Sequence, residues 1–192
     1  MIMNFKELVT RTRSYRRFNQ SGRIDYETLT GLIDLARLSA SGANRQPLKY
    51  LVYNTPDDCA RVFPSAIWAG YLKNWSGPEE GERPSAYIII LGDKLITENF
   101  GVDHGIAAQS IMLGANEAGF GGCMIASIRR DELRKEFDIP ERYEILLILA
   151  LGEPVEKVVI EDIKNDDVKY WRDEDQTHHV PKRRLDDLVL KL

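Results

Sequence analysis

The sequence has few residues of the kinds that build disulfide-bonded or metal-binding proteins. Its two cysteines, Cys59 and Cys123, lie far apart along the chain and show no metal-ligand spacing. We therefore expect them to be buried or incidental thiols without a disulfide bond. The adjacent histidines His178 and His179 have no further ligands at a suitable spacing, so no metal site is predicted.

A nucleophilic catalytic group is also lacking. Asp103 and His104 could act as an acid and base pair, but no nucleophile stands at a matching spacing. The glycine-rich segment from Gly119 to Ser127, GFGGCMIAS, has neither the P-loop spacing nor the dinucleotide-binding fingerprint. The sequence therefore favours neither a catalytic triad nor nucleotide binding through such a loop.

An excess of charge of one sign is absent too. The 192 residues include 26 basic and 30 acidic side chains, and this formal charge of −4 gives no general attraction to nucleic acid or membrane. No apolar run approaches membrane length, and the first residues, MIMNFKELV, do not resemble a signal peptide. We therefore expect one cytoplasmic domain over residues 1–192, with a small molecule as its partner.

Polar groups are concentrated in the segment from Ser39 to Tyr53, SASGANRQPLKYLVY. Gly42 allows the backbone to pass close to a ligand, and Asn44 and Gln46 place two amides within one turn. The proline that follows disfavours a helix, and the next six residues are predicted to form a strand. An ordinary connection between a helix and a strand would have the same composition, so this segment alone leaves both interpretations open.

Basic groups gather near both ends of the chain. The segment RTRSYRRF, from Arg11 to Phe18, has four arginines within seven residues, which is typical of a solvated helix end. Guanidinium groups around a serine hydroxyl would equally suit a phosphate, because they offer several donors to its oxygens. A second basic group follows the two histidines, in HHVPKRRLDD. Both a solvated surface and an anion site would explain these residues.

Capping residues and apolar spacing predict the secondary structure. Asn4 and Asp25 are suited to begin helices, and Phe5, Leu8 and Val9 form the side that the first helix would bury. Continuous apolar runs predict strands that are buried on both faces. The predicted helices are 5–12, 25–38, 102–118 and 130–137, and the predicted strands are 48–53, 87–91, a short one after 119, and 144–152. Residues 63–75 are predicted to be an aromatic core segment and residues 76–84 an exposed loop. The charged tail, 155–192, is predicted to be either disordered or packed on a neighbouring chain.

Four segments resemble the nitroreductase family, and they occur in the order that the family has. The N-terminal arginines match Arg-Arg-Ser-x-Arg-x-Phe, except that Thr12 stands at the first arginine. The polar loop matches Ser-x-x-Asn-x-Gln-Pro-Trp, except that Leu48 stands at the tryptophan. The glycine-rich segment resembles Gly-Leu-Gly-x-x-x-Ile, and the basic C-terminal segment resembles the end of the family's chains. The run IPERYEILLILALGEP is also similar to a family element.

The resemblance implies an α+β fold, with a mixed, mostly antiparallel sheet and helices on both of its faces. It also implies a homodimer with FMN at the interface, in which the tail 155–192 packs on the partner. The helix over 102–118 carries small residues that allow close packing against another helix, and the family uses this helix at its dimer interface.

The same resemblance implies which residues bind FMN. Arg13 and Ser14 would lie near the phosphate and ribityl chain, and Arg16 would lie at the pyrimidine edge of the flavin ring. Because Thr12 stands at the family's first arginine, Arg11 or a residue from the other end of the chain is an alternative phosphate ligand. At that other end the resemblance implies Lys182 and Arg183, or Arg184 if the register differs by one. The complete set implied by position is Arg13, Ser14, Arg16, Ser41, Asn44, Gln46, Ala126, Ser127, Lys182 and Arg183.

A protein of this kind would be an oxidoreductase. NAD(P)H would reduce FMN by hydride transfer and leave, and an electron-poor acceptor such as a nitroaromatic compound or a quinone would then take the electrons. The alternatives are an FMN storage or sensor protein, a flavin-dependent dehalogenase or flavin-destroying relative on the same scaffold, and a cofactor-free interaction domain. The sequence indicates neither the acceptor nor a preference for NADH or NADPH, nor whether the loop 76–84 forms a lid.

Overall fold

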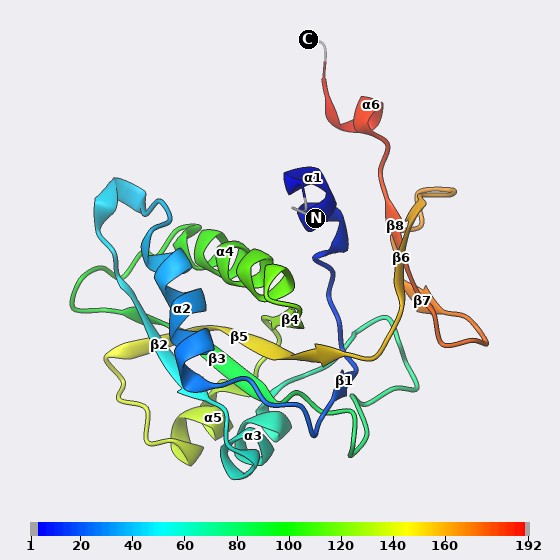
Figure 1. Cartoon of the computed structure of the whole chain (residues 1–192). Coiled ribbons are helices and arrows are strands. Elements are labelled where there is room, and N and C mark those ends of the chain that lie inside the picture. Colours follow the sequence, from blue (N-terminus) through cyan, green and yellow to red (C-terminus); the bar gives the residue numbers. More distant parts are fainter. Residues whose placement is uncertain (1–3, 191–192) are drawn as a thin grey trace.

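The computed structural model describes residues 4–190, in which helices cover both faces of a five-stranded sheet (Figure 1). The strand order is β1-β5-β3-β2, β4 also pairs with β5, and each of these pairings is antiparallel. The predicted α+β fold is therefore confirmed. The strands of this sheet are β1 (Phe18–Asn19), β2 (Leu48–Tyr53), β3 (Ala86–Asp93), β4 (Gly121–Ile125) and β5 (Tyr143–Pro154).

Local sequence signals explain where the helices begin and end. The Asn4 side chain accepts a hydrogen bond from Glu7 N (2.9 Å) at the start of α1, and Asp25 accepts one from Thr28 N (2.6 Å) at the start of α2. Gly119, with a φ of 87°, follows the end of α4 as predicted. The helices are α1 (Phe5–Arg11), α2 (Tyr26–Arg37), α3 (Pro56–Val62), α4 (Asp103–Glu117), α5 (Arg130–Glu136) and α6 (Leu185–Leu188), with short 3-10 turns at η1 (Gly42–Asn44) and η2 (Phe63–Ser65).

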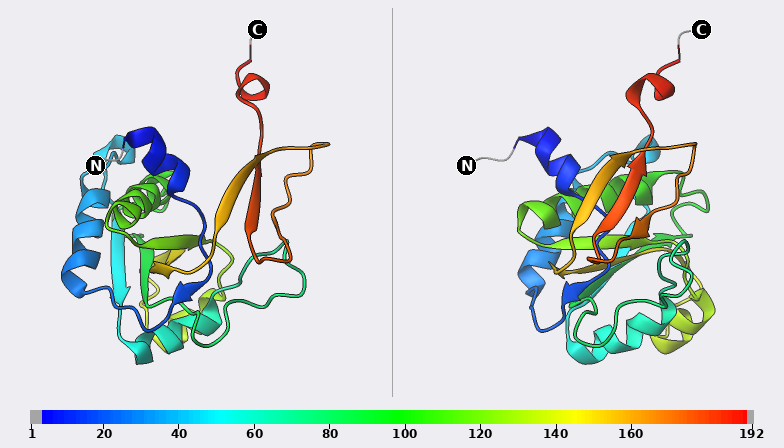
Figure 2. Two further views of the ribbon diagram at one scale, coloured as in Figure 1. Left: turned by 45° about the vertical axis from the view of Figure 1, so that its right-hand side comes forward. Right: turned by 90° about the vertical axis from the view of Figure 1, so that its right-hand side faces the viewer.

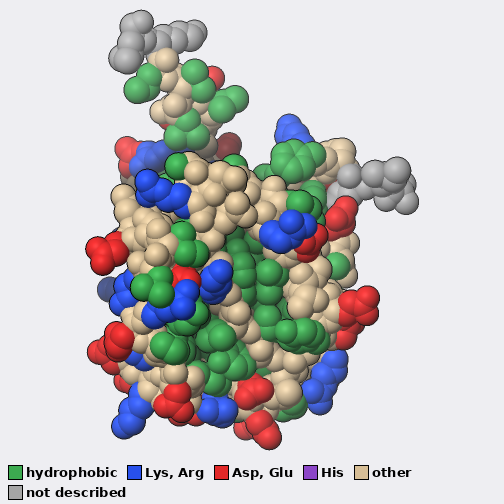
Figure 3. Space-filling model, turned by 90° about the vertical axis from the view of Figure 1, so that its left-hand side faces the viewer, with side chains coloured by type: hydrophobic (Ala, Val, Ile, Leu, Met, Phe, Trp, Pro, Cys, Tyr) green, Lys and Arg blue, Asp and Glu red, His purple; other side chains and the backbone are tan. Residues whose placement is uncertain are grey.

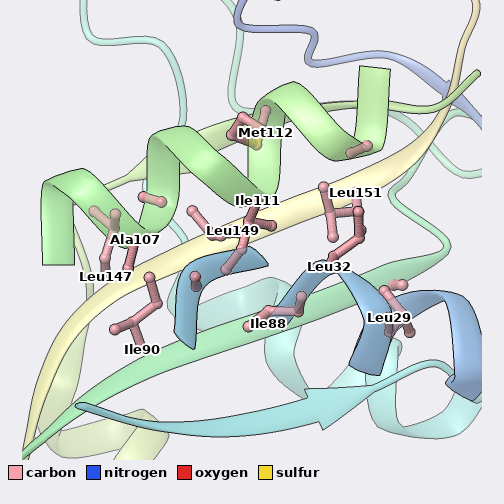
Figure 4. Close-up of a cluster of buried hydrophobic side chains, with 14 of the residues drawn as sticks. Leu29, Leu32, Ile88, Ile90, Ala107, Ile111, Met112, Leu147, Leu149 and Leu151 are labelled. Carbon is pink, nitrogen blue, oxygen red and sulfur yellow. The ribbon is translucent and has the colours of Figure 1, made fainter. Parts of the chain in front are cut away.

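Strand β3 lies at the centre of the protein because it is buried on both faces. Ile88 and Ile90 point to the side that α2 and α4 cover, where they belong to the same cluster as Ile111 of α4 (Figure 4). Tyr87 and Ile89, one residue out of phase, pack on the other side with residues of α3 and α5. This alternation explains why a continuous apolar run folds as a buried strand, as the sequence predicted.

The predicted buried side of α1 is wrong for the chain as the structure describes it. Phe5 is 72% exposed, and α1 contains no buried residue. The reason is that α1 lies over α4, away from the central sheet (Figure 1). Helix α4, in contrast, uses a small residue for close packing within the chain, because a Cβ at Gly114 would clash with Leu35 Cδ1 of α2.

Residues 76–84 are not the wholly exposed loop that the sequence predicted. Gly77 and Pro78 are buried. Gly77 has a φ of 129° and lies so close to the ring of Trp68 that a Cβ would come within 2.7 Å of it. Trp68 is a buried member of the predicted aromatic core segment, whereas Tyr71 is 50% exposed. The prediction of an aromatic core thus holds only in part.

The tail after β5 is folded, so the disordered alternative is wrong for its described part. It forms a three-stranded sheet of β6 (Val158–Asp162), β7 (Trp171–Arg172) and β8 (His178–Lys182) in the order β6-β8-β7. Strands β6 and β8 are parallel, and β7 and β8 are antiparallel. This small sheet stands beside the main body, and α6 extends away from both (Figure 2).

The two cysteines are buried thiols, as expected. Burial raises the pKa of the Cys59 thiol to about 12 and also raises the pKa of Cys123, so both are protonated and unreactive at neutral pH. Among residues 4–190, none of the helices combines the length and the hydrophobicity that a bilayer crossing requires.

The His179 side chain on β8 contacts residues from both other parts of the small sheet. Its Nδ1 lies 2.5 Å from Glu161 Oε1 on β6, and its Nε2 lies 3.0 Å from Asp173 Oδ2 after β7. The ring also stacks on Trp171, with ring centroids 3.9 Å apart. The hydrogen bond to Asp173 is the main cause that raises the pKa of His179 above its usual value. A charged imidazolium can donate to both carboxylates at once, which a neutral ring cannot.

We expect His179→Gln to lower the free energy of unfolding more at about pH 6 than at about pH 9. Because the pKa of His179 is raised in the folded protein, the stabilisation is complete below the ordinary value of 6.5 and is lost as the pH rises through the folded value. Urea unfolding of both proteins at the two pH values measures the difference. An equal loss of stability at both would contradict a charged clamp.

Candidate active site

A cavity of about 310 Å³ lies between the segment after α1 and strand β8, which come from opposite ends of the chain. We call it the cation cavity because Arg13, Arg16 and Lys182 line it, and none of its lining residues within 4–190 is acidic. The remaining lining residues are Thr12, Ser14, Gln109, Met112, Met124, Tyr170, His178 and Val180.

Arg13 lies two residues after the end of α1, and the last turns of that helix hold its side chain. Its Nη2 donates to Val9 O (2.7 Å), whereas its Nε is buried and has no hydrogen-bond partner within residues 4–190. Burial lowers the pKa of Arg13, although a guanidinium stays charged at neutral pH. The Thr12 hydroxyl donates to Leu8 O (2.8 Å) and so serves the helix end. An anion in the cavity would give the buried Arg13 Nε a partner.

Arg16 is the most enclosed cation of this cavity, with only 8% of the residue exposed. Its Nη1 lies 3.2 Å from Ser14 O and 3.1 Å from His178 Nε2. The guanidinium also stands over the ring of Tyr170, 4.8 Å from the centroid. The backbone N–H of Arg16 donates to the carboxylate of Glu156, so that carboxylate bonds the main chain of Arg16 and not its guanidinium.

A second cavity, of about 160 Å³, adjoins the first and shares Arg16, Met124 and Tyr170 with it. Ala126 and Ser127, which follow β4, line this second cavity together with residues 67–70. The two segments are joined by a hydrogen bond from the backbone N–H of residue 67 to Ser127 O (3.0 Å). The N-terminal arginines and the segment after β4 thus form one continuous site.

The polar loop from Ser41 to Gln46 is held by Asp103, the first residue of α4. Ser41 Oγ donates to Asp103 Oδ2 (2.6 Å), and Gly42 N–H donates to Asp103 Oδ1 (2.9 Å). Gln46 then donates from its backbone N–H to Ser41 Oγ (2.9 Å) and from Nε2 to Asn44 Oδ1 (3.1 Å). Asn44 and Gln46 have φ values of 54° and 51°, a left-handed region that asparagine tolerates but glutamine seldom adopts without such support. Asp103 is therefore a loop anchor, and the sequence indicated this residue only as half of an acid and base pair.

This loop and the cation cavity lie apart within one chain. Ser41 and Gln46 line a separate cavity of about 230 Å³ beside the first turns of α4, and no residue lines both cavities. Figure 3 shows the side of the molecule that carries the loop, with hydrophobic side chains gathered along a hollow. A single chain thus brings together Arg13, Ser14, Arg16, Lys182, Ala126 and Ser127, but it does not bring Ser41, Asn44 or Gln46 to them.

The basic C-terminal segment contributes one residue to the cation cavity, which is Lys182. Arg183 lines neither that cavity nor the adjoining one, and its Nη1 pairs with Asp166 (2.7 Å). The alternatives Arg11 and Arg184 line neither of the two cavities.

Neighbouring side chains of a strand point to opposite sides, and this separates the two histidines of β8. His178 lines the cation cavity, whereas His179 faces the carboxylates of the small sheet. The sequence did not indicate His178, Tyr170 or Glu156 as site residues. The tail was expected to be disordered or to pack on a neighbouring chain. Its sequence therefore did not indicate that these side chains lie beside Arg16.

Comparison of the sequence with models of known protein families gives a match over most of the chain. The Nitroreductase family model matches residues 9–153. This chain belongs to the nitroreductase family. The matched range of this nitroreductase family protein includes the segments that carry Arg13, Ser41 and Ser127, and it ends before the segment that carries Lys182.

This nitroreductase family protein is similar to two proteins of known structure and to one relative that matches by sequence. A nitroreductase family protein from Clostridium difficile 630 is 25% identical with a TM-score of 0.65, and the match covers 80% of this chain and 86% of that one. An FMN-dependent nitroreductase from Clostridium difficile R20291 is 21% identical with a TM-score of 0.63, over 83% and 91% of the two chains. "Putative NAD(P)H nitroreductase YodC" of Bacillus subtilis strain 168 is 21% identical over 182 residues, 79% of this chain and 90% of YodC.

We expect Asp103→Ala to raise the hydrogen-exchange rate of the Gly42 amide by roughly 10- to 100-fold, because a hydrogen bond to a charged group contributes about 1.5–3 kcal/mol. Asp103→Asn is the matched control and should give a smaller increase, since its side-chain oxygen can still accept a hydrogen bond. Exchange followed by NMR measures both. An unchanged rate in the Ala variant would show that the loop is held by other contacts.

Proposed function

We propose that this protein is an oxidoreductase that binds FMN in the cation cavity, takes electrons from NAD(P)H and passes them to a small electron-poor acceptor such as a nitroaromatic compound or a quinone. The observation that supports this most is a cavity lined by three cationic side chains and no acidic one among its described lining residues. Membership of the nitroreductase family and the similarity to an FMN-dependent relative support the same proposal.

The residues of the cation cavity suit the parts of FMN. The phosphate is an anion with several acceptor oxygens, so Arg13 with its unpartnered Nε, Ser14 and Lys182 would hold it and the ribityl chain. Arg183 would join them only if its ion pair with Asp166 opened. Ala126 and Ser127 would line the space for the ring in the adjoining cavity.

Arg16 would act on the redox step itself. Bound FMN supplies the chemistry, since a hydride from NAD(P)H adds two electrons and one proton and leaves negative charge at the pyrimidine edge of the ring. A guanidinium held at that edge favours the reduced state, because it stabilises charge that is absent from the oxidised state. No protein nucleophile is needed for this reaction.

We also propose that a second copy of the chain completes the site. Ser41, Asn44 and Gln46 lie away from the cation cavity of their own chain, so a two-fold partner would bring this loop to the flavin. Such a partner would also cover apolar side chains that one chain leaves exposed, and it would receive the end of the tail. The exposed apolar residues at the two ends are Phe5, Leu185, Leu188, Val189 and Leu190.

The protein loaded with FMN is expected to show the absorbance band of oxidised flavin, and anaerobic titration with NADH or NADPH should bleach it. Addition of a nitroaromatic compound or a quinone should restore the band. Flavin that binds but stays oxidised with both nucleotides would support FMN storage or sensing in place of turnover. A protein that binds no flavin would be an interaction domain, and the proposal would be withdrawn.

We expect Arg13→Ala to weaken FMN binding by roughly 10- to 100-fold, which corresponds to the loss of a charged hydrogen bond of about 1.5–3 kcal/mol. Arg23→Ala is the control, because Arg23 is exposed and lines neither the cation cavity nor the adjoining one. Flavin fluorescence titration measures both affinities. The same affinity in the wild type and in Arg13→Ala would place the phosphate elsewhere.

A further inference from the structure

His178 is placed to act on Arg16. Its Nε2 lies 3.1 Å from Arg16 Nη1, and only 1% of the residue is exposed. A guanidinium N–H can only donate, so His178 Nε2 is the acceptor of this hydrogen bond. A histidine nitrogen accepts only when it carries no proton. The hydrogen bond therefore requires a neutral ring with its proton on Nδ1.

The groups that face His178 favour this neutral form. Burial is the largest effect, and the charges of Arg16, Arg172 and His179 add to it, so that the pKa of His178 falls to about 4. No carboxylate within residues 4–190 is hydrogen-bonded to the ring. The nearby Glu156 bonds Arg172 (2.9 Å) and the backbone N–H of Arg16.

The guanidinium of Arg16 has neutral partners among the described residues. These are the carbonyl oxygen of Ser14, the Nε2 of His178 and the ring of Tyr170. Tyr170 also packs on His178, with ring centroids 5.2 Å apart. A carboxylate in one of these places would cancel much of the positive charge. The cavity instead holds an enclosed guanidinium that is oriented by groups without charge.

We propose that His178 is a positioning residue that holds the Arg16 guanidinium toward the bound flavin while leaving its positive charge uncompensated. This inference rests on the proposed function, and it assigns the control of the flavin potential to a side chain that acts through Arg16. The charge of Arg16 favours the reduced flavin. By holding that charge in place, a neutral His178 would make the midpoint potential of the flavin higher than it would be without this hydrogen bond.

The test uses the full chain loaded with FMN and compares two variants. His178→Phe keeps an aromatic ring but cannot accept a hydrogen bond, whereas His178→Gln keeps a neutral acceptor. We expect His178→Phe to lower the midpoint potential, and each tenfold loss of preference for reduced over oxidised FMN corresponds to about 30 mV. His178→Gln should stay close to the wild-type potential. His179→Gln, on the other side of β8, is the control and should leave the potential unchanged.

A double-mutant cycle shows whether the effect acts through Arg16. Arg16→Ala should lower the midpoint potential, and adding His178→Phe to that variant should lower it no further. If FMN binds and His178→Phe leaves the potential unchanged, the inference is overturned while the proposed function stands. The inference is also overturned if His178→Phe has its full effect without Arg16. A wild type that binds no FMN at all would instead refute the proposed function.

A measurement on the wild type keeps the inference testable if His178→Phe does not fold. Nitrogen NMR of the histidine rings distinguishes the two neutral tautomers from the charged form, with or without flavin. We expect His178 to stay neutral with its proton on Nδ1 between about pH 5 and pH 8. A proton on Nε2 within this range would remove the acceptor from Arg16 and overturn the inference.

Discussion

The antiparallel pairing of β3 with β5 is the interaction on which the other parts of the structure depend. Helices cover both faces of these two strands, and β5 also pairs with β4 and β1. One strand therefore joins the start of the chain to the glycine-rich segment. Two residues beyond β5, the carboxylate of Glu156 accepts a hydrogen bond from the backbone of Arg16. The central sheet thus fixes the place of the cation cavity.

Elements with local signals were predictable from the sequence, and elements that depend on distant partners were not. Caps and apolar spacing identified α2 and α4, and apolar runs identified β3 and β5. The folded sheet of the tail was not predicted, because it is held by pairs such as Glu156–Arg172 and His179–Asp173. The composition of these polar residues is typical of a solvated segment. The predicted buried side of α1 was wrong for the opposite reason, since Phe5 is a typical core residue but stays mostly exposed in the described chain.

The same distinction applies to the candidate site. Arg13, Ser14 and Arg16 are close in sequence, so their spacing was enough to indicate them. His178 reaches Arg16 from 162 positions away, and a pair of adjacent histidines does not reveal which ring faces which side. The loop contacts of Asp103 could not be predicted for a chemical reason, because a carboxylate suits proton transfer as well as it suits two donors of a strained loop.

The neighbouring histidines have opposite charge requirements, and strand geometry satisfies both. Burial and nearby cations lower the pKa of His178 to about 4, so the stability linked to its neutral form is complete above the ordinary value of 6.5 and is lost as the pH falls. The pKa of His179 is raised, so its contribution is complete below that value and is lost as the pH rises. Strand β8 turns one ring toward guanidinium groups and the other toward carboxylates. Because the charged ring is paired with its own carboxylates, the strand can carry it directly beside the neutral ring that Arg16 needs.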